Sequence, residues 1–381
     1  MKPLIIIGTG LAGYTLAREW RKLETSRPLI MISTDDGGFY SKPMLSNALA
    51  QGREPASLVN KTAEQMQQDL DARILTHQQV SSIDPVQKII DCQGERFSYE
   101  QLVLAVGANP IRLPISGNAA DTILSVNSLQ DYTVFREQLE QAQTVTILGA
   151  GLIGCEFADD LLSAGKTVQI IDPAEWPLGR LLPESSGKAL KQALQGSGVQ
   201  WHLEKTLEFI DADISGYRLT LSDQGRLESD LVLSAVGLRP NLTLATQAGL
   251  QTNRGIRTNR LLQTSHNDIY ALGDCAEVEG LILPYVMPIM HAARALAKTL
   301  AGTPTEVAYP AMPVLVKTPS CPTIVAPPAP DAAGDWIVEV DGINTEAQFK
   351  APDGQLLGFA LTGSRADRKQ ALTAELPAVL K

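Results

Sequence analysis

The sequence predicts an α/β protein with two doubly wound, Rossmann-like units and a small α+β unit at the C-terminal end. Three observations support this prediction. A strand-length apolar run, a glycine-rich turn and a helix-forming stretch follow one another over residues 3–23, and the same arrangement recurs over residues 144–164. From about Pro310 the chain becomes proline-rich and then alternates apolar and polar residues. Because the two glycine-rich motifs are far apart in the chain, we expect two separate parallel sheets.

The first glycine-rich turn is Gly8-Thr9-Gly10-Leu11-Ala12-Gly13. In such a turn the first glycine permits the tight backbone, the second lets the chain approach a pyrophosphate, and the third lets helix and strand pack closely. The phosphates then lie at the helix N-terminus, where free N–H groups and the helix dipole favour negative charge. The next apolar run, residues 29–32, leads to Thr34, Asp35 and Asp36. One of these carboxylates is expected to bind a ribose, and the spacing leaves open which one.

The second glycine-rich turn is Gly149-Ala150-Gly151-Leu152-Ile153-Gly154, and the strand after it, residues 167–171, leads to Asp172. A carboxylate at this position can bind the 2′-hydroxyl of an adenosine ribose. The nearest following arginine, Arg180, stands eight positions on. The pattern therefore predicts a site that prefers NADH to NADPH.

Other strand-length runs end in glycine and suggest how the chain is divided. Two of them lead into Gly107 and Gly237, and a third leads into Gly273-Asp274. The segments 336–340 and 356–361 alternate like strands, and a helix is expected near residues 366–376. We expect one nucleotide-binding domain over residues 1–113 and 241–310, a second over 114–240, and a C-terminal domain over 311–381.

Composition excludes several classes of function. The net charge of −10 and the acidic pI of about 5.0 argue against a nucleic-acid surface, which needs clustered Lys and Arg. No apolar run is long enough to span a bilayer, so no membrane insertion is expected. The four cysteines, Cys92, Cys155, Cys275 and Cys321, are scattered without metal-ligand spacing or a CxxC pair. We therefore expect a cytoplasmic protein with no metal site.

Taken in order, these segments resemble the pyridine-nucleotide-disulfide oxidoreductase superfamily of flavoproteins. The resemblance implies that the first turn binds FAD and the second binds NAD(H). It also implies that Asp274, in Gly273-Asp274, holds the ribityl chain of the flavin. The start of the segment Pro284–Arg294 resembles a helix N-terminus that faces the flavin pyrimidine, where the dipole would stabilise a reduced, anionic ring.

Within that superfamily, Tyr40-Ser41-Lys42-Pro43-Met44-Leu45-Ser46 resembles a segment of the ferredoxin and rubredoxin reductase branch. The resemblance places Lys42 near the flavin N5 edge and Glu156 in the same region, both as catalytic residues. It implies a Lys42–Glu156 ion pair that orients the nicotinamide against the flavin. The further cofactor contacts that it implies are, for FAD, Pro43, Val80, Ala105, Gly107, Val286 and Lys317, and for NAD(H), Gly237.

Departures from the superfamily narrow the chemistry. The chain lacks the redox cysteine pair and the single active cysteine of related enzymes, and its last histidine is His291, so thiol chemistry is not expected. Hydride from NADH would pass to FAD, and single electrons would then pass to rubredoxin. The alternatives are an NADH-dependent flavorubredoxin or ferredoxin reductase, or a cofactor-binding flavoprotein with slow NADH oxidation. Alkane degradation and oxygen defence are both compatible with the resemblance.

Two expectations concern association. The C-terminal domain is shorter than the dimerisation domain of disulfide reductases, which favours a monomer. The basic cluster Arg365-Ala366-Asp367-Arg368-Lys369 is a candidate surface for docking an acidic carrier protein, although solvated helix charges explain it equally well.

Overall fold

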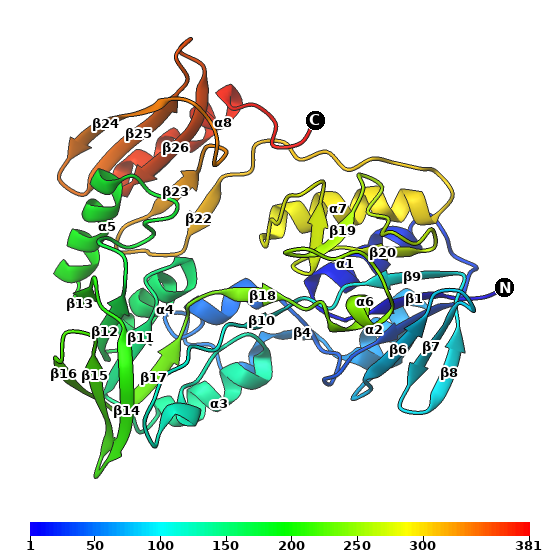
Figure 1. Cartoon of the computed structure of the whole chain (residues 1–381), viewed down its shortest axis with the longest axis horizontal. Coiled ribbons are helices and arrows are strands. Elements are labelled where there is room, and N and C mark those ends of the chain that lie inside the picture. The colour runs from blue at the N-terminus through cyan, green and yellow to red at the C-terminus, as the bar shows by residue number, and fades with distance from the viewer.

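The computed structural model describes residues 1–381 and contains three units (Figure 1). The first unit is built on a parallel five-stranded sheet with the strand order β20-β9-β1-β2-β5. Its strands are β1 (Leu4–Ile7), β2 (Leu29–Ile32), β5 (Arg73–Leu75), β9 (Gln101–Leu104) and β20 (Ile269–Ala271). Because β20 comes from late in the chain, the first unit is discontinuous in sequence.

Helices cover this sheet and smaller β-structures flank it. Helix α1 packs against α7, and the two lie side by side on the sheet (Figure 1). The helical elements are α1 (Leu11–Arg21), η1 (Lys42–Asn47), η2 (Pro55–Leu58), α2 (Ala63–Leu70), α6 (Thr243–Gln247) and α7 (Val286–Leu300). The flanking strands are β3 (Phe39–Tyr40), β4 (Val59–Lys61), β6 (Val80–Asp84), β7 (Ile89–Cys92), β8 (Glu95–Ser98), β19 (Ile256–Thr258) and β21 (Ala276–Val278).

The second unit repeats the doubly wound plan with a parallel sheet in the order β13-β12-β11-β17. Its strands are β11 (Thr144–Leu148), β12 (Thr167–Asp172), β13 (Gln200–Leu203) and β17 (Leu231–Ser234). A three-stranded meander packs beside them, made of β14 (Leu207–Asp213), β15 (Gly216–Leu221) and β16 (Arg226–Ser229). The helices are η3 (Ala120–Thr122), α3 (Leu129–Leu139), α4 (Leu152–Ser163) and α5 (Glu184–Gly196).

The chain crosses between these two units at an antiparallel pair, β10 (Ala108–Pro110) with β18 (Leu238–Pro240). These are the two segments that follow the predicted strand–glycine sequences at Gly107 and Gly237. They meet in register, with Asn109 opposite Arg239. The outgoing and returning passages therefore form one two-stranded connection.

The C-terminal unit is an antiparallel five-stranded sheet with the order β22-β23-β26-β25-β24. Its elements are β22 (Val314–Val316), β23 (Thr323–Ala326), β24 (Asp335–Asp341), β25 (Asn344–Lys350), β26 (Leu356–Thr362), η4 (Gly363–Arg368) and α8 (Lys369–Glu375). The predicted α+β character is confirmed. The expected terminal helix begins as the 3₁₀ turn η4 before it continues as α8.

The buried core shows which units belong together. One cluster of 44 buried residues fills the first unit. A second cluster of 29 fills the second unit and continues into the C-terminal sheet through Val316, Val325 and Ala360. Helix α5 packs against β25 and β26, and the buried hydroxyls of Ser186 and Thr345 lie 2.8 Å apart across this contact. The second and C-terminal units therefore share one hydrophobic core. None of the helices is both long enough and apolar enough to cross a lipid bilayer.

Candidate functional site

Two glycines in each fingerprint are required by close backbone packing. Gly8 and Gly149 have φ of 113° and 103°, which side-chain-bearing residues rarely adopt. A Cβ on Gly13 would lie 2.0 Å from the carbonyl oxygen of Gly8, and one on Gly154 would lie 1.9 Å from that of Gly149. Each helix therefore packs on its preceding strand more closely than any other residue type would permit.

The middle glycines have a different role, because they open onto free space. A Cβ on Gly10 or Gly151 would meet no atom within 4 Å. Gly10 caps α1 and Gly151 caps α4, and neither helix start has a side-chain cap. The first N–H groups of both helices are thus available to an anion, and the dipole of each helix favours one. This arrangement fits two dinucleotides, one at each turn.

A carboxylate is connected to each fingerprint. Asp172 at the end of β12 accepts hydrogen bonds from the N–H groups of Ala150, at 2.6 Å, and Ala174, at 2.7 Å. In the first unit, the Thr9 hydroxyl donates to Ser33 at 2.5 Å, and the Ser33 hydroxyl donates to Asp35. Asp36, in contrast, accepts from the N–H of Gly38 only. Of the two candidate ribose-binding aspartates, Asp35 is therefore the one linked to the first fingerprint by hydrogen bonds. Thr34 is exposed beside it.

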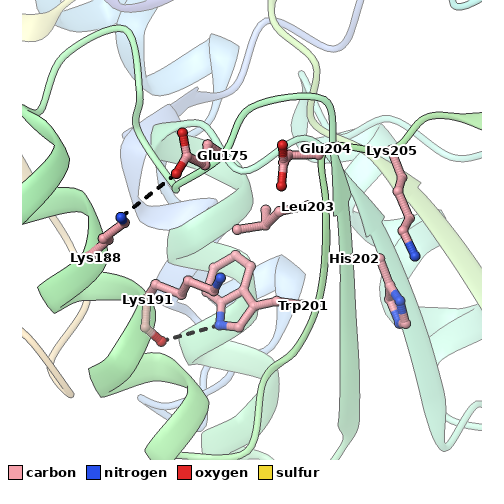
Figure 2. A pocket seen from close by; sticks show the side chains of 8 residues that line it. All are labelled: Glu175, Lys188, Lys191, Trp201, His202, Leu203, Glu204 and Lys205. Atoms are coloured by element: carbon pink, nitrogen blue, oxygen red, sulfur yellow. Dashed lines mark hydrogen bonds and ion pairs between the residues drawn. The ribbon is translucent and has the colours of Figure 1, made fainter.

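An open cavity of about 310 Å³ lies at the outer edge of the second sheet and contains no fingerprint residue (Figure 2). It is lined by Glu175, Lys188, Lys191, Trp201, His202, Leu203, Glu204 and Lys205. The N–H of Lys205 donates to the carbonyl of Asp172 at 3.2 Å, which ties the cavity wall to the predicted ribose site. Glu175 and Lys188 face each other at 3.7 Å across the cavity. The sequence patterns did not predict this cavity.

Lys42 lies at the start of η1 and is half-buried. Its Nζ donates to Oδ1 of Asn127 at 2.5 Å, and the Asn127 amide donates to the carbonyl of Ala108 at 2.8 Å. Burial lowers the pKa of Lys42, and the carboxylates of Asp274 and Asp131 oppose that shift. Burial raises the pKa of Asp274, and Lys42 opposes it. Lys42 and Asp274 therefore interact electrostatically.

Gly273 brings Asp274 to the first fingerprint. Gly273 has φ of 81°, and a Cβ there would lie 2.8 Å from the Cβ of Ala12 in α1. The Gly-Asp pair consequently lies against the first turn of α1. The structure thus brings together Ala12, Lys42 and Asp274, which are far apart in the sequence.

The expected Lys42–Glu156 ion pair does not form, so this prediction is wrong. Glu156 pairs instead with Lys317, whose Nζ lies 2.5 Å from Oε2 of Glu156 and whose backbone N–H donates to Oε1 at 3.0 Å. The Ser46 hydroxyl also donates to Glu156, at 2.6 Å. The C-terminal unit packs on α4 and brings Lys317, directly after β22, to Glu156. The Lys42 ammonium instead donates to Asn127. Ser46 belongs to the segment Tyr40–Ser46, which the sequence singles out, whereas no sequence pattern indicates Asn127.

The remaining predicted residues are distributed over several elements. The Lys317 ammonium donates to the carbonyl of Pro43 at 2.5 Å, and Gly107 and Gly237 both have positive φ beside the crossing strands. Ala105 is buried against Gly8, and Val80 is buried in β6. Val286 is exposed at the start of α7, a helix whose cap residue offers no side-chain hydrogen bond.

The four cysteines are not placed for thiol chemistry. All four are buried and free, and burial raises the pKa of every one of these thiols. A thiolate is the reactive form of cysteine, so none of them is prepared to attack a disulfide. No group of three or more His, Cys, Asp or Glu side chains is placed to hold a metal ion.

Two open dinucleotide turns in one chain, with no exposed thiol beside them, define a two-nucleotide oxidoreductase. A family model described as "Pyridine nucleotide-disulphide oxidoreductase" matches residues 2–298, and the chain belongs to this family. Its members use FAD and NAD(H). A second model, described as "Rubredoxin binding C-terminal domain", matches residues 306–376.

Individual relatives agree over the whole chain. A rubredoxin-NAD(+) reductase of Alcanivorax borkumensis is 47% identical over 100% of both chains. A rubredoxin-NAD(+) reductase of Acinetobacter baylyi is 49% identical over 98% of this chain and 97% of its own. Among solved structures, the ferredoxin reductase for the CYP199A2 system from Rhodopseudomonas palustris superposes with a TM-score of 0.89 at 25% identity, covering 99% of this chain and 96% of that one. The predicted fold class and superfamily are thereby confirmed.

Proposed function

We propose that this chain is an NADH-dependent flavoprotein reductase that delivers electrons to rubredoxin. The observation that carries the proposal is the match of residues 306–376 to a rubredoxin-binding domain that shares its core with the unit holding the second fingerprint. FAD, when bound, accepts hydride from NADH and can release electrons singly to an iron centre. Since every thiol is buried, the electrons have no disulfide route within the chain.

The site residues are assigned on the same basis. The first turn, with Asp35 and Asp274, would hold FAD, and the second turn, with Asp172, would hold NADH. The backbone N–H groups of α1 and α4 would bind the two pyrophosphates. The Lys42 ammonium would lie beside the flavin ring, and the Glu156–Lys317 pair would close the region where the nicotinamide meets it.

The division of the chain and its cellular context complete the proposal. We assign residues 1–113 and 241–310 to the FAD-binding domain, 114–240 to the NAD(H)-binding domain and 311–381 to the C-terminal domain. Four free thiols fit a reducing compartment such as the cytoplasm. Helix α5 of the same chain covers one face of the C-terminal sheet, which favours a monomer, and light scattering at assay concentration tests this.

The basic cluster in η4 and α8 is less suited to docking than its sequence suggests. Arg365 lies 3.7 Å from Glu339, and Arg368 lies 3.3 Å from Glu346, so both guanidinium groups have partners within the C-terminal unit. Their paired charges steer an acidic carrier more weakly than free ones would.

Parallel acceptor assays test the proposed function. The purified yellow protein is given NADH together with rubredoxin, ferredoxin, flavorubredoxin, ferricyanide, a disulfide or oxygen. We expect rubredoxin to be reduced fastest among the protein acceptors and the disulfide not at all. Preferential reduction of flavorubredoxin or ferredoxin would select the alternative within the same branch. Reduction of the disulfide above all others would overturn the proposal.

Replacing Lys42 with Ala should slow flavin reduction by NADH without releasing FAD. In the proposed site the Lys42 ammonium, which interacts with Asp274, would put one positive charge near the flavin ring, and losing such a positioned charge costs about 10²–10³-fold in rate. Stopped-flow absorbance at the flavin band measures the rate, and the bound-flavin content gives the control. A variant that retains its flavin and the wild-type rate would remove Lys42 from the mechanism.

A further inference from the structure

Helix α4 carries three buried acids on one face, and they reach different units of the protein. Glu156, Asp159 and Asp160 are 4%, 6% and 3% exposed. Their i, i+3 and i+4 spacing places them on one side of the helix. Carboxylates buried this deeply require hydrogen-bond partners, so the groups they contact show what each one holds in place.

Two of the three acids bind the C-terminal unit. Glu156 pairs with Lys317, and Asp159 accepts hydrogen bonds from the N–H of Ser320, at 3.2 Å, and from its hydroxyl. Asp160 accepts no hydrogen bond from the C-terminal unit. Its carboxylate accepts from the backbone N–H groups of Leu49, at 3.2 Å, and Ala50, at 2.8 Å, which belong to the first unit.

Asp160 binds Leu49 and Ala50, which lie just after η1, the short helix that begins at Lys42. Leu45 and Ala48 are buried in the core of the second unit, although the chain around them belongs to the first. Ser46 is bonded to Glu156 one helical turn before Asp160 on α4. The segment 42–50 is therefore fixed to α4 at two points, a side-chain contact at Ser46 and a backbone contact at residues 49 and 50.

The other end of α4 is Gly151, where the second fingerprint opens. A single rigid helix thus connects the predicted NADH pyrophosphate site to the segment that begins with Lys42. We infer that Asp160 is a positioning residue that holds Lys42 in place for hydride transfer through its two backbone hydrogen bonds. The inference rests on the proposed function, because it takes NADH and FAD as the reacting pair.

Asp160→Asn is the main test variant. An Asn side chain of the same shape can accept one N–H through its carbonyl oxygen, but it presents its own N–H₂ to the other. We expect faster amide hydrogen exchange across the whole segment 42–50 and flavin reduction by NADH slowed about 10-fold, with little change in the KM for NADH. A shifted long-wavelength flavin band should accompany the slower rate. Asp160→Ala should show the same changes more strongly.

Asp159→Asn is the matched control. Asp159 is the neighbouring buried acid on the same helix, but its partner is Ser320. This variant should lower the unfolding temperature without changing exchange in the segment 42–50, the flavin band or the reduction rate. The inference is overturned if exchange in Asp160→Asn rises only at residues 49 and 50 while reduction keeps the wild-type rate. An equal loss of rate in Asp159→Asn would also overturn it.

These readouts separate the inference from the proposed function. Hydrogen exchange and the NADH-to-flavin half-reaction involve no rubredoxin, so a protein that fails to reduce rubredoxin still decides the role of Asp160. If Asp160→Ala yields no folded protein, Asp160→Asn decides alone. If NADH does not reduce the wild-type flavin, the proposed function fails. Exchange across 42–50 that stays at the wild-type rate in Asp160→Asn would then still contradict the positioning role.

Discussion

Gly151→Val should leave the protein folded and yellow while raising the KM for NADH by at least about 100-fold. The added side chain enters open space, because a Cβ at Gly151 meets no atom within 4 Å and its φ of −77° suits any residue. That space is where the pyrophosphate would approach the N-terminus of α4. Losing two hydrogen bonds to a charged group, at about 1.5–3 kcal/mol each, accounts for the size of the effect.

Two further glycine variants act as controls for Gly151→Val. Gly10→Val places the same obstruction in the first turn and should reduce FAD content instead. Gly154→Ala puts a methyl group 1.9 Å from the carbonyl of Gly149, so it should destabilise the second unit itself. Steady-state kinetics, flavin content and thermal unfolding distinguish the three. An unchanged KM in Gly151→Val would mean that NADH does not bind at this turn.

Breaking the Glu156–Lys317 pair should cost both stability and rate. Glu156→Gln leaves Lys317 without a charged partner, and Lys317→Met leaves a buried carboxylate. Each single change should destabilise the shared core by roughly 2–3 kcal/mol, an estimate reduced from that for fully buried pairs because the Lys317 side chain is 23% exposed. The double variant should lose less than the sum, because it removes both charges.

Tryptophan fluorescence during urea unfolding can follow this core. Trp176 and Trp201 belong to the second unit and Trp336 to the C-terminal unit, whereas Trp20 is buried in the first. Stopped-flow reduction by NADH gives the matching rates. Strictly additive effects of the two single changes would show that the ion pair contributes nothing to either property.

The sequence predicted the local parts of the site well for a physical reason. A dinucleotide turn needs three glycines at fixed spacing between a strand and a helix, so Gly8–Gly13 and Gly149–Gly154 could be recognised without knowledge of the tertiary structure. The same holds for the strand that ends at Asp172. Each of these features depends on neighbours within a few residues.

The parts that were missed depend on packing between units. Lys317 and Glu156 are 161 positions apart, and no periodicity shows that β22 lies beside α4. The expected Lys42–Glu156 pair was wrong because a closer cation, delivered by another unit, occupies the carboxylate. Asn127 lies in a connecting loop, where side-chain type alone does not reveal a partner.

The shared core of the second and C-terminal units limits how the protein can be re-engineered or diversify. The two nucleotide-binding units meet through polar contacts with α4, a pair of short strands and a few apolar side chains such as Leu45 and Ala48. The C-terminal sheet, in contrast, is packed directly against α5 of the second unit. Transplanting that sheet alone into another reductase would leave Val316, Val325 and Ala360 without the surface that buries them. A change of electron acceptor is therefore easier to achieve by altering the exposed residues of the sheet than by exchanging it as a module.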